Sequence, residues 1–485
     1  MYDIIIIGGG IIGTVTAREL SKYALKILLI ECGTDIAIGA TKANSGILHA
    51  GYDCIPGTLK ARLNVKGSIM YPGLCNELDI PYRTNGSLVI ATNQNDQARL
   101  QILYKQGLEN GVASMEILSS NDVYALEPNL SSNITGALRA KTAGIISPYE
   151  AGIAFGESAA INGVEFLLET KVKNIKADGK NGYVLQAISQ NNRHCKSAKN
   201  EKTFRSRIII NAAGVSSADI NNHISPLKEE IVPWRGQYYI LDNTQKNLVN
   251  HTIFQLPTNL GKGVLVVPTI DHNILLGPTA EAPENPHATA TTAESLHDIL
   301  VKTKQILKTV PIHDRITTYA GIRAKHSSKD FVLEEATPGF INAIGIDSPG
   351  LTAAPAIAEY ITEMATKRLQ PALNPNFNPV RIGITSFREL SQADQVAAIK
   401  GNQAYGRVIC RCETITEAEI LDAIHRPIGA KNLDAIKRRT RAQMGRCQGG
   451  FCKLRIVELL SQELGIPLTD VTKDGVGSEI MPIQL

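Results

Sequence analysis

The chain begins with three segments whose hydrophobic patterns differ. Residues 2–7 (YDIIII) are almost continuously apolar and β-branched, the pattern of a strand buried on both faces of a parallel sheet. Residues 13–24 (GTVTARELSKYA) show apolar positions at helical spacing, and 26–31 (KILLIE) are a second apolar run. A strand, a glycine turn, a helix and a strand in this order predict a βαβ unit.

Apolar runs predict strands and helices in alternation along the rest of the chain. The predicted strands are 86–91, 207–214, 236–242, 262–269, 272–279 and 340–346, and the predicted helices are 94–110, 150–161, 291–309, 352–368, 416–425 and 453–464. This order favours an α/β fold, in which a Rossmann-like nucleotide-binding sheet carries an inserted, mostly antiparallel α+β layer. The polar run 188–204 is expected to be an exposed hairpin loop.

Composition and charge exclude several classes of protein. With 43% apolar and 20% charged residues the chain is typical of a soluble globular protein, and its net charge of +4 gives no reason to expect nucleic-acid binding. No apolar run approaches the roughly 18 residues that a spanning helix needs, and the chain runs into its first strand without the basic region and cleavage site of a signal peptide, so we expect none. We expect a cytoplasmic protein. Peripheral association with the inner face of a membrane, through a partner, stays open.

The turn after the first strand has the chemistry of a dinucleotide site. Gly8, Gly10 and Gly13 form G-x-G-x-x-G between a strand and a helix. Side chains there would block the approach of a pyrophosphate to the backbone, and the helix N-terminus offers free N–H groups and a positive dipole end. Glu31, 18 residues after Gly13, can accept hydrogen bonds from ribose hydroxyls. The alternative is a purely structural glycine turn.

Three further segments carry a resemblance to a known superfamily. ATKANSGILHAG (40–51), IIINAAG (208–214) and GIDSPGLTAAPAIAEYI (345–361) resemble the flavin-contacting segment, the returning strand and the closing helix of FAD-dependent oxidoreductases of the D-amino-acid oxidase and glycerol-3-phosphate dehydrogenase superfamily. The likeness covers roughly residues 1–370 and implies FAD rather than NAD. It also implies that the N-terminus of helix 352–368 points at the pyrimidine edge of the flavin, where its dipole stabilises negative charge.

The resemblance implies a set of cofactor-binding residues and a division into domains. The expected FAD contacts are Gly8, Gly10, Ile11, Ile12, Gly13, Glu31, Thr41, Asn44, Ser45, Gly46, Ile47, Val172, Ala213, Gly214, Gly350, Leu351 and Thr352. FAD-binding parts are expected at about 1–75, 150–220 and 320–370, and substrate-binding parts at about 76–149 and 221–319. The proline- and asparagine-rich stretch 368–381 is the best domain boundary. We expect a linker at 371–400 and a small helical domain at 401–485.

Four of the eight cysteines fall into two close pairs near the C-terminus. Cys410 and Cys412 form C-x-C, and after 34 intervening residues Cys447 and Cys452 form C-x4-C. Two thiolate pairs separated by a helical spacer can converge on a soft metal centre, either zinc or an iron-sulfur cluster. The stretch 431–455 is also strongly basic. Its cations are Lys431, Lys437, Arg438, Arg439, Arg441, Arg446, Lys453 and Arg455. We expect them, with the N–H groups of CQGGFC, to stabilise a negatively charged cluster, unless they form only a solvated face.

This stretch is similar to the 2Fe-2S domain of the bacterioferritin-associated ferredoxin type. The wider family has C-x2-C as its second pair, and the C-x4-C form resembles the C-terminal domain of anaerobic glycerol-3-phosphate dehydrogenases and related amine or hydroxyacid dehydrogenases. The likeness implies a 2Fe-2S cluster, with structural zinc as the alternative. A two-electron flavin beside a one-electron centre implies a dehydrogenase that feeds an electron-acceptor subunit or a quinone, because an oxidase has no use for the second centre.

Oxidation of an alcohol by a flavin needs a cation for the anionic end of the substrate and a base for its hydroxyl proton. YAGIRAKHS (319–327) resembles the strand whose arginine binds the substrate anion, which gives Arg323 that role and makes Lys325 a second candidate. His49 in GILHAG matches a histidine close to the isoalloxazine, as base, flavin tuner or structural residue. His251 is a weaker catalytic candidate. Further weak candidates for the roof of the pocket are Arg235, Tyr238 and Lys262.

The sequence leaves the substrate open. AGYDCIP and DSPGLTA lack an arginine-tyrosine pair and a lysine that aerobic glycerol-3-phosphate dehydrogenases carry there. A phosphate would depend on Arg323, Lys325, Lys60, Arg62 or Lys262. Our hypothesis is an FAD-dependent dehydrogenase that oxidises sn-glycerol 3-phosphate by hydride transfer to flavin N5. One alternative is an L-2-hydroxyglutarate or amino-acid dehydrogenase, and residues 44–67 also resemble L-2-hydroxyglutarate dehydrogenase. A second alternative is a non-catalytic electron-transfer subunit.

Overall fold

The apolar run at the start of the chain forms β1 (Tyr2–Ile7), whose isoleucines are buried at the centre of the first sheet. This computed structural model describes residues 1–179, 182–190, 201–256 and 263–481. The strand order is β10-β11-β12-β1-β2-β9, and β12 and β2 pair with β1 in parallel. The other strands are β2 (Ile27–Ile30), β9 (Glu165–Leu167), β10 (Thr170–Ala177), β11 (Tyr183–Ser189), β12 (Glu201–Asn211), β18 (Val332–Thr337) and β19 (Phe340–Ile344). β19 joins β12 in parallel, and β18 pairs antiparallel with β19.

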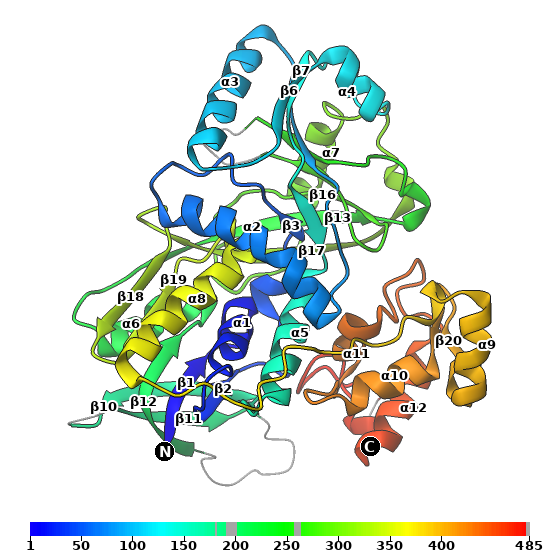
Figure 1. The fold of residues 1–485 in the computed structure, drawn as a ribbon. Coiled ribbons are helices and arrows are strands. Elements are labelled where there is room, and N and C mark those ends of the chain that lie inside the picture. Colours follow the sequence, from blue (N-terminus) through cyan, green and yellow to red (C-terminus); the bar gives the residue numbers. More distant parts are fainter. Residues whose placement is uncertain (180–181, 191–200, 257–262, 482–485) are drawn as a thin grey trace.

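Both faces of this sheet are covered, as a continuously apolar strand requires. Ile4 and Ile6 pack with residues of α1, α5 and α8 in one apolar cluster. Ile5 and Ile7 point to the opposite face and pack with side chains of β11 and of α6 (Ser217–Ile224). The helices on the first face are α1 (Ile11–Leu20), α2 (Leu59–Leu78), α5 (Pro148–Ile161) and α8 (Gly350–Leu369), and Figure 1 shows them side by side. The βαβ unit predicted from the sequence is confirmed.

A second, mostly antiparallel sheet lies above the first in Figure 1. Its strand order is β17-β13-β16-β15-β14-β5-β7-β6. These strands are β5 (Ser87–Ala91), β6 (Met115–Ser119), β7 (Gly136–Ala140), β13 (Ile231–Leu241), β14 (Thr252–Gln255), β15 (Leu265–Pro268), β16 (Ile274–Gly277) and β17 (Arg315–His326). Three helices pack on it: α3 (Gln94–Glu109), α4 (Ser120–Leu126) and α7 (Ala293–Thr303). The predicted fold class, a Rossmann-like domain with an inserted antiparallel layer, is confirmed.

The helix α2 was not predicted, because glycine and proline interrupt its pattern. Gly67, Pro72 and Gly73 all lie inside its 20 residues. Gly67 is there for packing: a Cβ atom on it would lie 2.1 Å from the backbone oxygen of Thr352. The missing side chain therefore lets α2 cross close over the start of α8. A short sheet of β3 (Ile47–Leu48), β8 (Gly144–Ile146) and β4 (Tyr82–Arg83) connects this region to the second sheet.

The C-terminal part is a small helical unit with its own apolar core. Its elements are α9 (Gln392–Gly401), β20 (Val408–Cys410), β21 (Ile415–Thr416), α10 (Glu417–His425), α11 (Leu433–Thr440) and α12 (Lys453–Leu464). The first of these helices lies mainly within the expected linker 371–400. Most of the expected loop 188–204 lies outside the described residues, and its ends belong to β11 and β12. No helix in the described part of the chain is long and apolar enough to span a bilayer.

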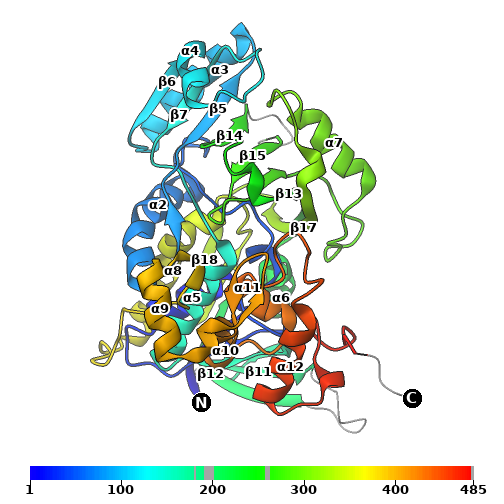
Figure 2. The ribbon, with the colours of Figure 1, turned by 90° about the vertical axis from the view of Figure 1, so that its right-hand side faces the viewer.

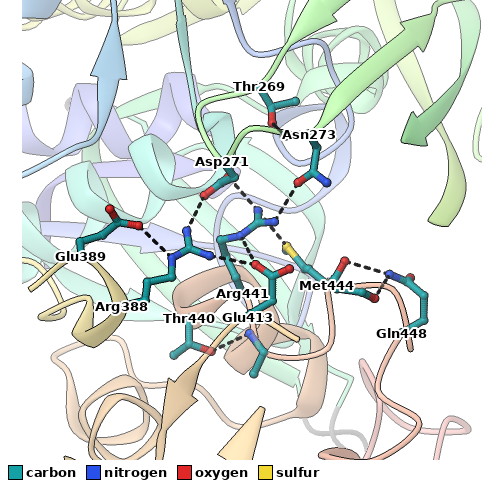
Figure 3. A network of polar contacts seen from close by, with 12 residues as sticks. Thr269, Asp271, Asn273, Arg388, Glu389, Glu413, Thr440, Arg441, Met444 and Gln448 are labelled. Carbon is teal, nitrogen blue, oxygen red and sulfur yellow. Dashed lines mark hydrogen bonds and ion pairs between the residues drawn. The ribbon is translucent and has the colours of Figure 1, made fainter. Parts of the chain in front are cut away.

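Arginines of the C-terminal part bind carboxylates of the rest of the chain. α11 lies beside α5 (Figure 2), and Arg438 and Arg439 at its end both bind Asp35, at 2.8 and 2.7 Å. Arg441 binds Asp271, in the turn between β15 and β16, at 2.7 Å (Figure 3). These arginines were expected to stabilise the cluster or to lie in a solvated face. They instead form buried ion pairs that dock the C-terminal part.

The docking contacts include the loop that carries the cysteines. Arg441 Nε also binds Glu413 at 3.0 Å, and Arg388 contacts the same carboxylate at 3.0 Å (Figure 3). Glu413 follows Cys412 directly. The position of this loop relative to the second sheet is therefore fixed by charged groups.

A second buried carboxylate, Glu157 on α5, binds Arg381 and Arg426. Its side chain is completely buried, and the two guanidinium groups lie at 2.6 and 2.7 Å. Burial opposes ionisation, but the two arginines hold the pKa of Glu157 below its usual range. These two contacts tie α5 to the segment that follows α8 and to the end of α10.

Replacing Glu157 by Gln is expected to leave two buried guanidinium groups without their carboxylate. Breaking a buried pair on one side costs about 3–5 kcal/mol, so the segment between α8 and α9 should detach from α5 and be cleaved faster by trypsin, while the contacts of α11 with Asp35 stay in place. Electrophoresis of the fragments over time measures this rate. The control is Glu363→Gln, which removes an exposed ion pair with Lys367 and should leave cleavage unchanged. An equal rate for Glu157→Gln and the native chain would contradict the prediction.

Candidate active site and cluster site

A cavity of about 1960 Å³ extends from the first sheet to the second. Most predicted site residues line it, although they come from distant parts of the chain. They are Gly8, Gly10, Ile11, Ile12, Glu31, Thr41, Asn44, Ser45, Ile47, His49, Val172, Ala213, Gly214, Arg323, Lys325, Gly350 and Leu351. Small-molecule pockets usually measure about 300–1000 Å³. This cavity therefore has room for a dinucleotide and a substrate together.

The glycine turn needs its glycines for close backbone contacts. Gly8 has φ +107°, and a Cβ atom on it would lie 2.4 Å from the carbonyl oxygen of Ala212. A Cβ atom on Gly13 would lie 1.9 Å from the carbonyl oxygen of Gly8. Gly13 therefore lies behind the cavity wall, whereas Gly10 and Ile12 are on it. The first turn of α1 consequently faces the cavity with its dipole and its N–H groups.

Two side chains fix the edge of this turn. Thr41 Oγ1 accepts a hydrogen bond from the backbone N–H of Ile11 at 2.9 Å. Glu31 Oε2 accepts from Gly9 N–H at 2.6 Å, and Oε1 from Gly33 N–H at 2.7 Å. The Cys32 thiol also donates to Oε1, at 3.3 Å. Oε2 keeps a second lone pair, with which Glu31 can accept from a ribose hydroxyl at the end of β2.

The segment 41–49 forms the wall between the two sheets. Asn44 Oδ1 accepts from Gly46 N–H at 2.8 Å, and a Cβ atom on Gly46 would lie 2.5 Å from a backbone oxygen. Thr352 Oγ1 accepts from His49 N–H at 2.9 Å. Gly46 and Thr352 therefore support the wall from behind. In front of Thr352, Gly350 and Leu351 at the N-terminus of α8 line the cavity.

These features fit FAD. The pyrophosphate needs a turn without Cβ atoms and a helix N-terminus, which Gly8, Gly10 and α1 provide. The ribose needs a carboxylate at the end of β2, which is Glu31. A flavin ring needs a partial positive charge near its pyrimidine edge, which the N-terminus of α8 provides.

At the other end of the cavity, His49 and Arg323 offer a base and a cation. The His49 ring is half-buried, with Nε2 3.4 Å from Ser348 Oγ and its centroid 5.9 Å from that of Phe254. Arg323 Nη2 donates to the carbonyl oxygen of Thr279 at 3.3 Å. In the described part of the chain, no carboxylate lies within 4 Å of this guanidinium. Arg323 is therefore available for an anion.

Lys325 lies two residues further along β17. Its Nζ is 4.2 Å from the centroid of Trp234, the single tryptophan of the chain. Burial lowers the pKa of Lys325, Asp347 opposes this effect, and the positive charges of Arg323 and Lys60 lower the pKa further. Lys60 is itself paired with Asp347. Lys325 thus lies near two other cations and only one carboxylate among the described residues, and this excess of positive charge favours the binding of an anion.

Three other candidates have different surroundings. His251 does not line the cavity: it is buried, and its Nδ1 lies 2.7 Å from Glu127 Oε1. A buried hydrogen bond to a carboxylate explains this histidine without a catalytic role. Arg235 lines the cavity but is paired with Glu281 at 3.0 Å. Tyr238 also lines it and is stacked on Tyr319 at 4.7 Å, whereas Lys262 lies outside the described residues.

Two cavity residues were missed by sequence reasoning. Tyr319 lines the cavity and donates from its hydroxyl to the carbonyl oxygen of Asn44 at 2.9 Å. Ser348 faces His49 from the turn before α8. Tyr319 stands in YAGIRAKHS, where only the basic residues were considered, and Ser348 stands in DSPGLTA, where the expected flavin contacts were Gly350, Leu351 and Thr352. The side-chain direction at these positions depends on the register of β17 and on the turn.

The four C-terminal cysteines form two sulfur pairs. Cys410 contacts Cys452, and Cys412 contacts Cys447, so each pair joins one residue from each motif. Cys410 and Cys452 are buried, whereas Cys412 is exposed. The pKa of Cys410 is lowered to about 6, mainly by a hydrogen bond from the thiol of Cys452. Burial opposes this shift, and the backbone N–H groups of Gln443 and Glu413 add to it.

Backbone N–H groups surround the outer pair as expected. Gly449, Gly450 and Phe451 donate from their backbone to Cys447, and together with Cys412 they outweigh burial and lower the pKa of this thiol. Such donors stabilise thiolate sulfur. Within the described ranges, no three His, Cys, Asp or Glu side chains converge on one point as a single metal ion requires. Two pairs of thiols that do not converge on one point fit a two-iron cluster better than a tetrahedral zinc site, which needs all four ligands around a single ion.

Comparison with known proteins agrees with both sites. Residues 3–364 match the model of the FAD dependent oxidoreductase family, and residues 408–462 match the BFD-like [2Fe-2S] binding domain. The chain is 46% identical to the glycerol 3-phosphate dehydrogenase of Caloramator mitchellensis, over 99% of this chain and 98% of that protein. It is 31% identical to the mitochondrial L-2-hydroxyglutarate dehydrogenase of Bos taurus, over 58% of this chain and 61% of that protein.

The fold also matches a solved structure. The dithionite-reduced L-α-glycerophosphate oxidase of Mycoplasma pneumoniae, with FAD bound, superposes with a TM-score of 0.72 at 30% identity. The match covers 78% of this chain and 98% of that chain. The chain therefore belongs to the FAD dependent oxidoreductase family, and a BFD-like [2Fe-2S] binding domain follows its oxidoreductase part, so that FAD and a 2Fe-2S cluster are its cofactors.

Proposed function

We propose that this chain oxidises sn-glycerol 3-phosphate to dihydroxyacetone phosphate and passes the electrons to a separate acceptor. The FAD supplies a hydride acceptor at flavin N5, and the 2Fe-2S cluster supplies a one-electron carrier. The observation that carries the proposal is the pair of cations, Arg323 and Lys325, on the same cavity as His49. It stands in a chain that is 46% identical to a glycerol 3-phosphate dehydrogenase over nearly its whole length.

The two cations supply the anchor for the phosphate. A guanidinium binds two oxygens of a phosphate at once, and an ammonium adds a point charge beside it. Because Arg323 has its only described polar contact with a carbonyl oxygen, at 3.3 Å, binding an anion need not break an ion pair. In this proposal, Arg323 and Lys325 supply the positive charge that the missing arginine and lysine of AGYDCIP and DSPGLTA would otherwise provide.

His49 is the proposed base. Oxidation of the secondary alcohol breaks the C2–H bond, from which hydride leaves, and the C2 hydroxyl loses its proton. His49 Nε2 takes this proton, and Ser348 Oγ, 3.4 Å away, orients the ring or the hydroxyl. The bond from His49 N–H to Thr352 fixes the backbone of the base.

The proposed cluster ligands are Cys410, Cys412, Cys447 and Cys452. Their placement supports electron exit to another molecule, because Cys412 is exposed and Phe451, between the last two ligands, is 85% exposed. An acceptor can therefore approach the sulfur of Cys412 closely. We propose a protein subunit or a quinone for this acceptor, with any association to a membrane made through it.

A second candidate substrate is an L-2-hydroxy acid. The 31% identity to an L-2-hydroxyglutarate dehydrogenase supports it, and one guanidinium binds a carboxylate as well as a phosphate. A steady-state assay with an artificial electron acceptor separates the two. Turnover with 2-hydroxyglutarate and none with glycerol 3-phosphate would reject the first substrate.

Replacing Arg323 by Met is expected to lower kcat/KM for glycerol 3-phosphate by roughly 10²-fold, because a charged hydrogen bond worth about 3 kcal/mol is lost. Initial rates at several substrate concentrations measure this change. The matched control is Arg315→Met on the same strand. Arg315 is exposed and contacts only the carbonyl oxygen of Ile312 among the described residues, so its kcat/KM should stay at the native value. A native kcat/KM for Arg323→Met would contradict the assignment.

Lys325 predicts a pH dependence of substrate binding. Only its protonated form attracts the phosphate, and its pKa lies below the ordinary 10.5 because of burial and nearby cations. KM should therefore rise as the pH increases from about 7 to about 10, as Lys325 loses its proton. The variant Lys325→Arg keeps its charge over this range and should show a flat KM. A rise of equal size in both proteins would assign the effect to another group.

Replacing Cys412 by Ser is expected to abolish the paramagnetic signal of the reduced cluster, because one iron loses a thiolate ligand. Glycerol 3-phosphate should still bleach the flavin absorbance under anaerobic conditions, whereas turnover with a one-electron acceptor should be lost. Cys54→Ala, a change of a buried cysteine far outside the cluster motif, should leave both signals unchanged. Native one-electron turnover without a cluster signal would contradict the proposed exit.

A further inference from the structure

The loop 31–39, which follows β2, lines the cavity on one side and contacts the C-terminal part on the other. On its inner side, Glu31, Cys32 and Ile38 line the large cavity. On its outer side, Asp35 is 2% exposed and lies against α11 of the C-terminal part. The loop is therefore the thin wall between the end of the cavity where a ribose would bind and the domain that carries the cysteines.

Two arginines hold the outer side of this wall. Arg439 binds Asp35 through both terminal nitrogens, at 2.7 and 2.8 Å, and Arg438 binds the same carboxylate at 2.8 Å. The arginine side chains are only 1% and 5% exposed. Despite burial, the two positive charges hold the pKa of Asp35 below its usual range. The loop thus supplies a carboxylate that these two buried cations share.

Neighbouring residues extend the contact. Asn432 Nδ2 donates to Thr34 Oγ1 at 3.1 Å, and Ile36 packs in one apolar cluster with Ile428. On the inner side, Ala37 N–H donates to the carbonyl oxygen of Gly9, in the glycine turn, at 2.8 Å. The position of the loop is therefore tied to the glycine turn and to the C-terminal part at the same time.

We propose that Asp35 is a positioning residue for FAD: through Arg438 and Arg439, the docked C-terminal part holds loop 31–39 closed on the adenosine end of the cofactor. The inference rests on the FAD of the family and not on the proposed substrate. Its consequence is reciprocal, because a docked C-terminal part that strengthens FAD binding must itself be stabilised by FAD to the same degree. The iron-sulfur domain therefore serves flavin retention as well as electron transfer.

The variant that tests this is Asp35→Asn, which keeps the shape of the side chain and removes its charge. The matched control is Glu157→Gln. Glu157 also binds two arginines of the C-terminal side and is equally buried, but it stands on α5 and does not line the cavity. FAD is removed from each full-length protein and then titrated back into it. The difference in fluorescence between free and bound flavin gives the bound fraction at each concentration, and hence the Kd for FAD.

Asp35→Asn is expected to raise the Kd for FAD by about 10-fold, within the 5–150-fold that site-to-site coupling usually spans. Glu157→Gln should change it by less than about twofold, because its loss does not act on the loop. A native Kd in Asp35→Asn would overturn the proposal. An equal increase in both variants would also overturn it, since undocking in general, and not the loop, would then release FAD.

A measurement on the native chain keeps the proposal testable even if Asp35→Asn does not fold. Hydrogen exchange of the backbone amides is compared in FAD-free and FAD-loaded protein. FAD should slow exchange in α11, which has no residue on the cavity, as well as in loop 31–39. Protection of the loop without any change in α11 would show that the two are not coupled. Neither readout depends on turnover, so a wrong substrate leaves this test intact.

Discussion

Buried charge at the boundary between the two parts of the chain is the constraint on which the structure depends. Asp35 and Glu157 are inside the protein, and each is stable there only because two arginines bind it. The arginines come from the C-terminal side and the carboxylates from the oxidoreductase part. Undocking would leave charges of both signs without partners. The cysteine loop and the cavity are therefore held in one fixed arrangement.

The docking contacts also connect the cysteine loop and the cavity with each other. Arg441 connects Glu413, next to a proposed cluster ligand, with Asp271 in the β15–β16 turn, and residues at the start of β15 line the cavity. Asp35 connects α11 with the loop on the ribose side. One interface thus contacts the loop after β2 of the first sheet and the turn between β15 and β16 of the second sheet. Under the proposed function, a single docked state serves both FAD binding and the transfer of electrons from flavin to cluster.

Features that depend on neighbours along the chain could be predicted from the sequence. The run YDIIII, the spacing of Gly8, Gly10 and Gly13, and the acid at position 31 all lie in one βαβ unit, so local pattern defines them. Gly67 and Pro72 concealed α2, because their role is contact with α8 and not helix propensity. The pairing of Asp35 with Arg439 spans 404 positions, and no periodicity reports such a pair. The basic stretch was therefore recognised, but its partners were not.

The central claim is that electrons enter at the flavin cavity and reach the cluster inside one docked chain. The most direct test is rapid mixing of the anaerobic protein with glycerol 3-phosphate, followed by freezing and paramagnetic resonance at several protein concentrations. The account predicts that the signal of the reduced cluster appears after the flavin absorbance falls, with a rate independent of protein concentration. A cluster that stays oxidised, or is reduced at a rate proportional to protein concentration, would contradict it.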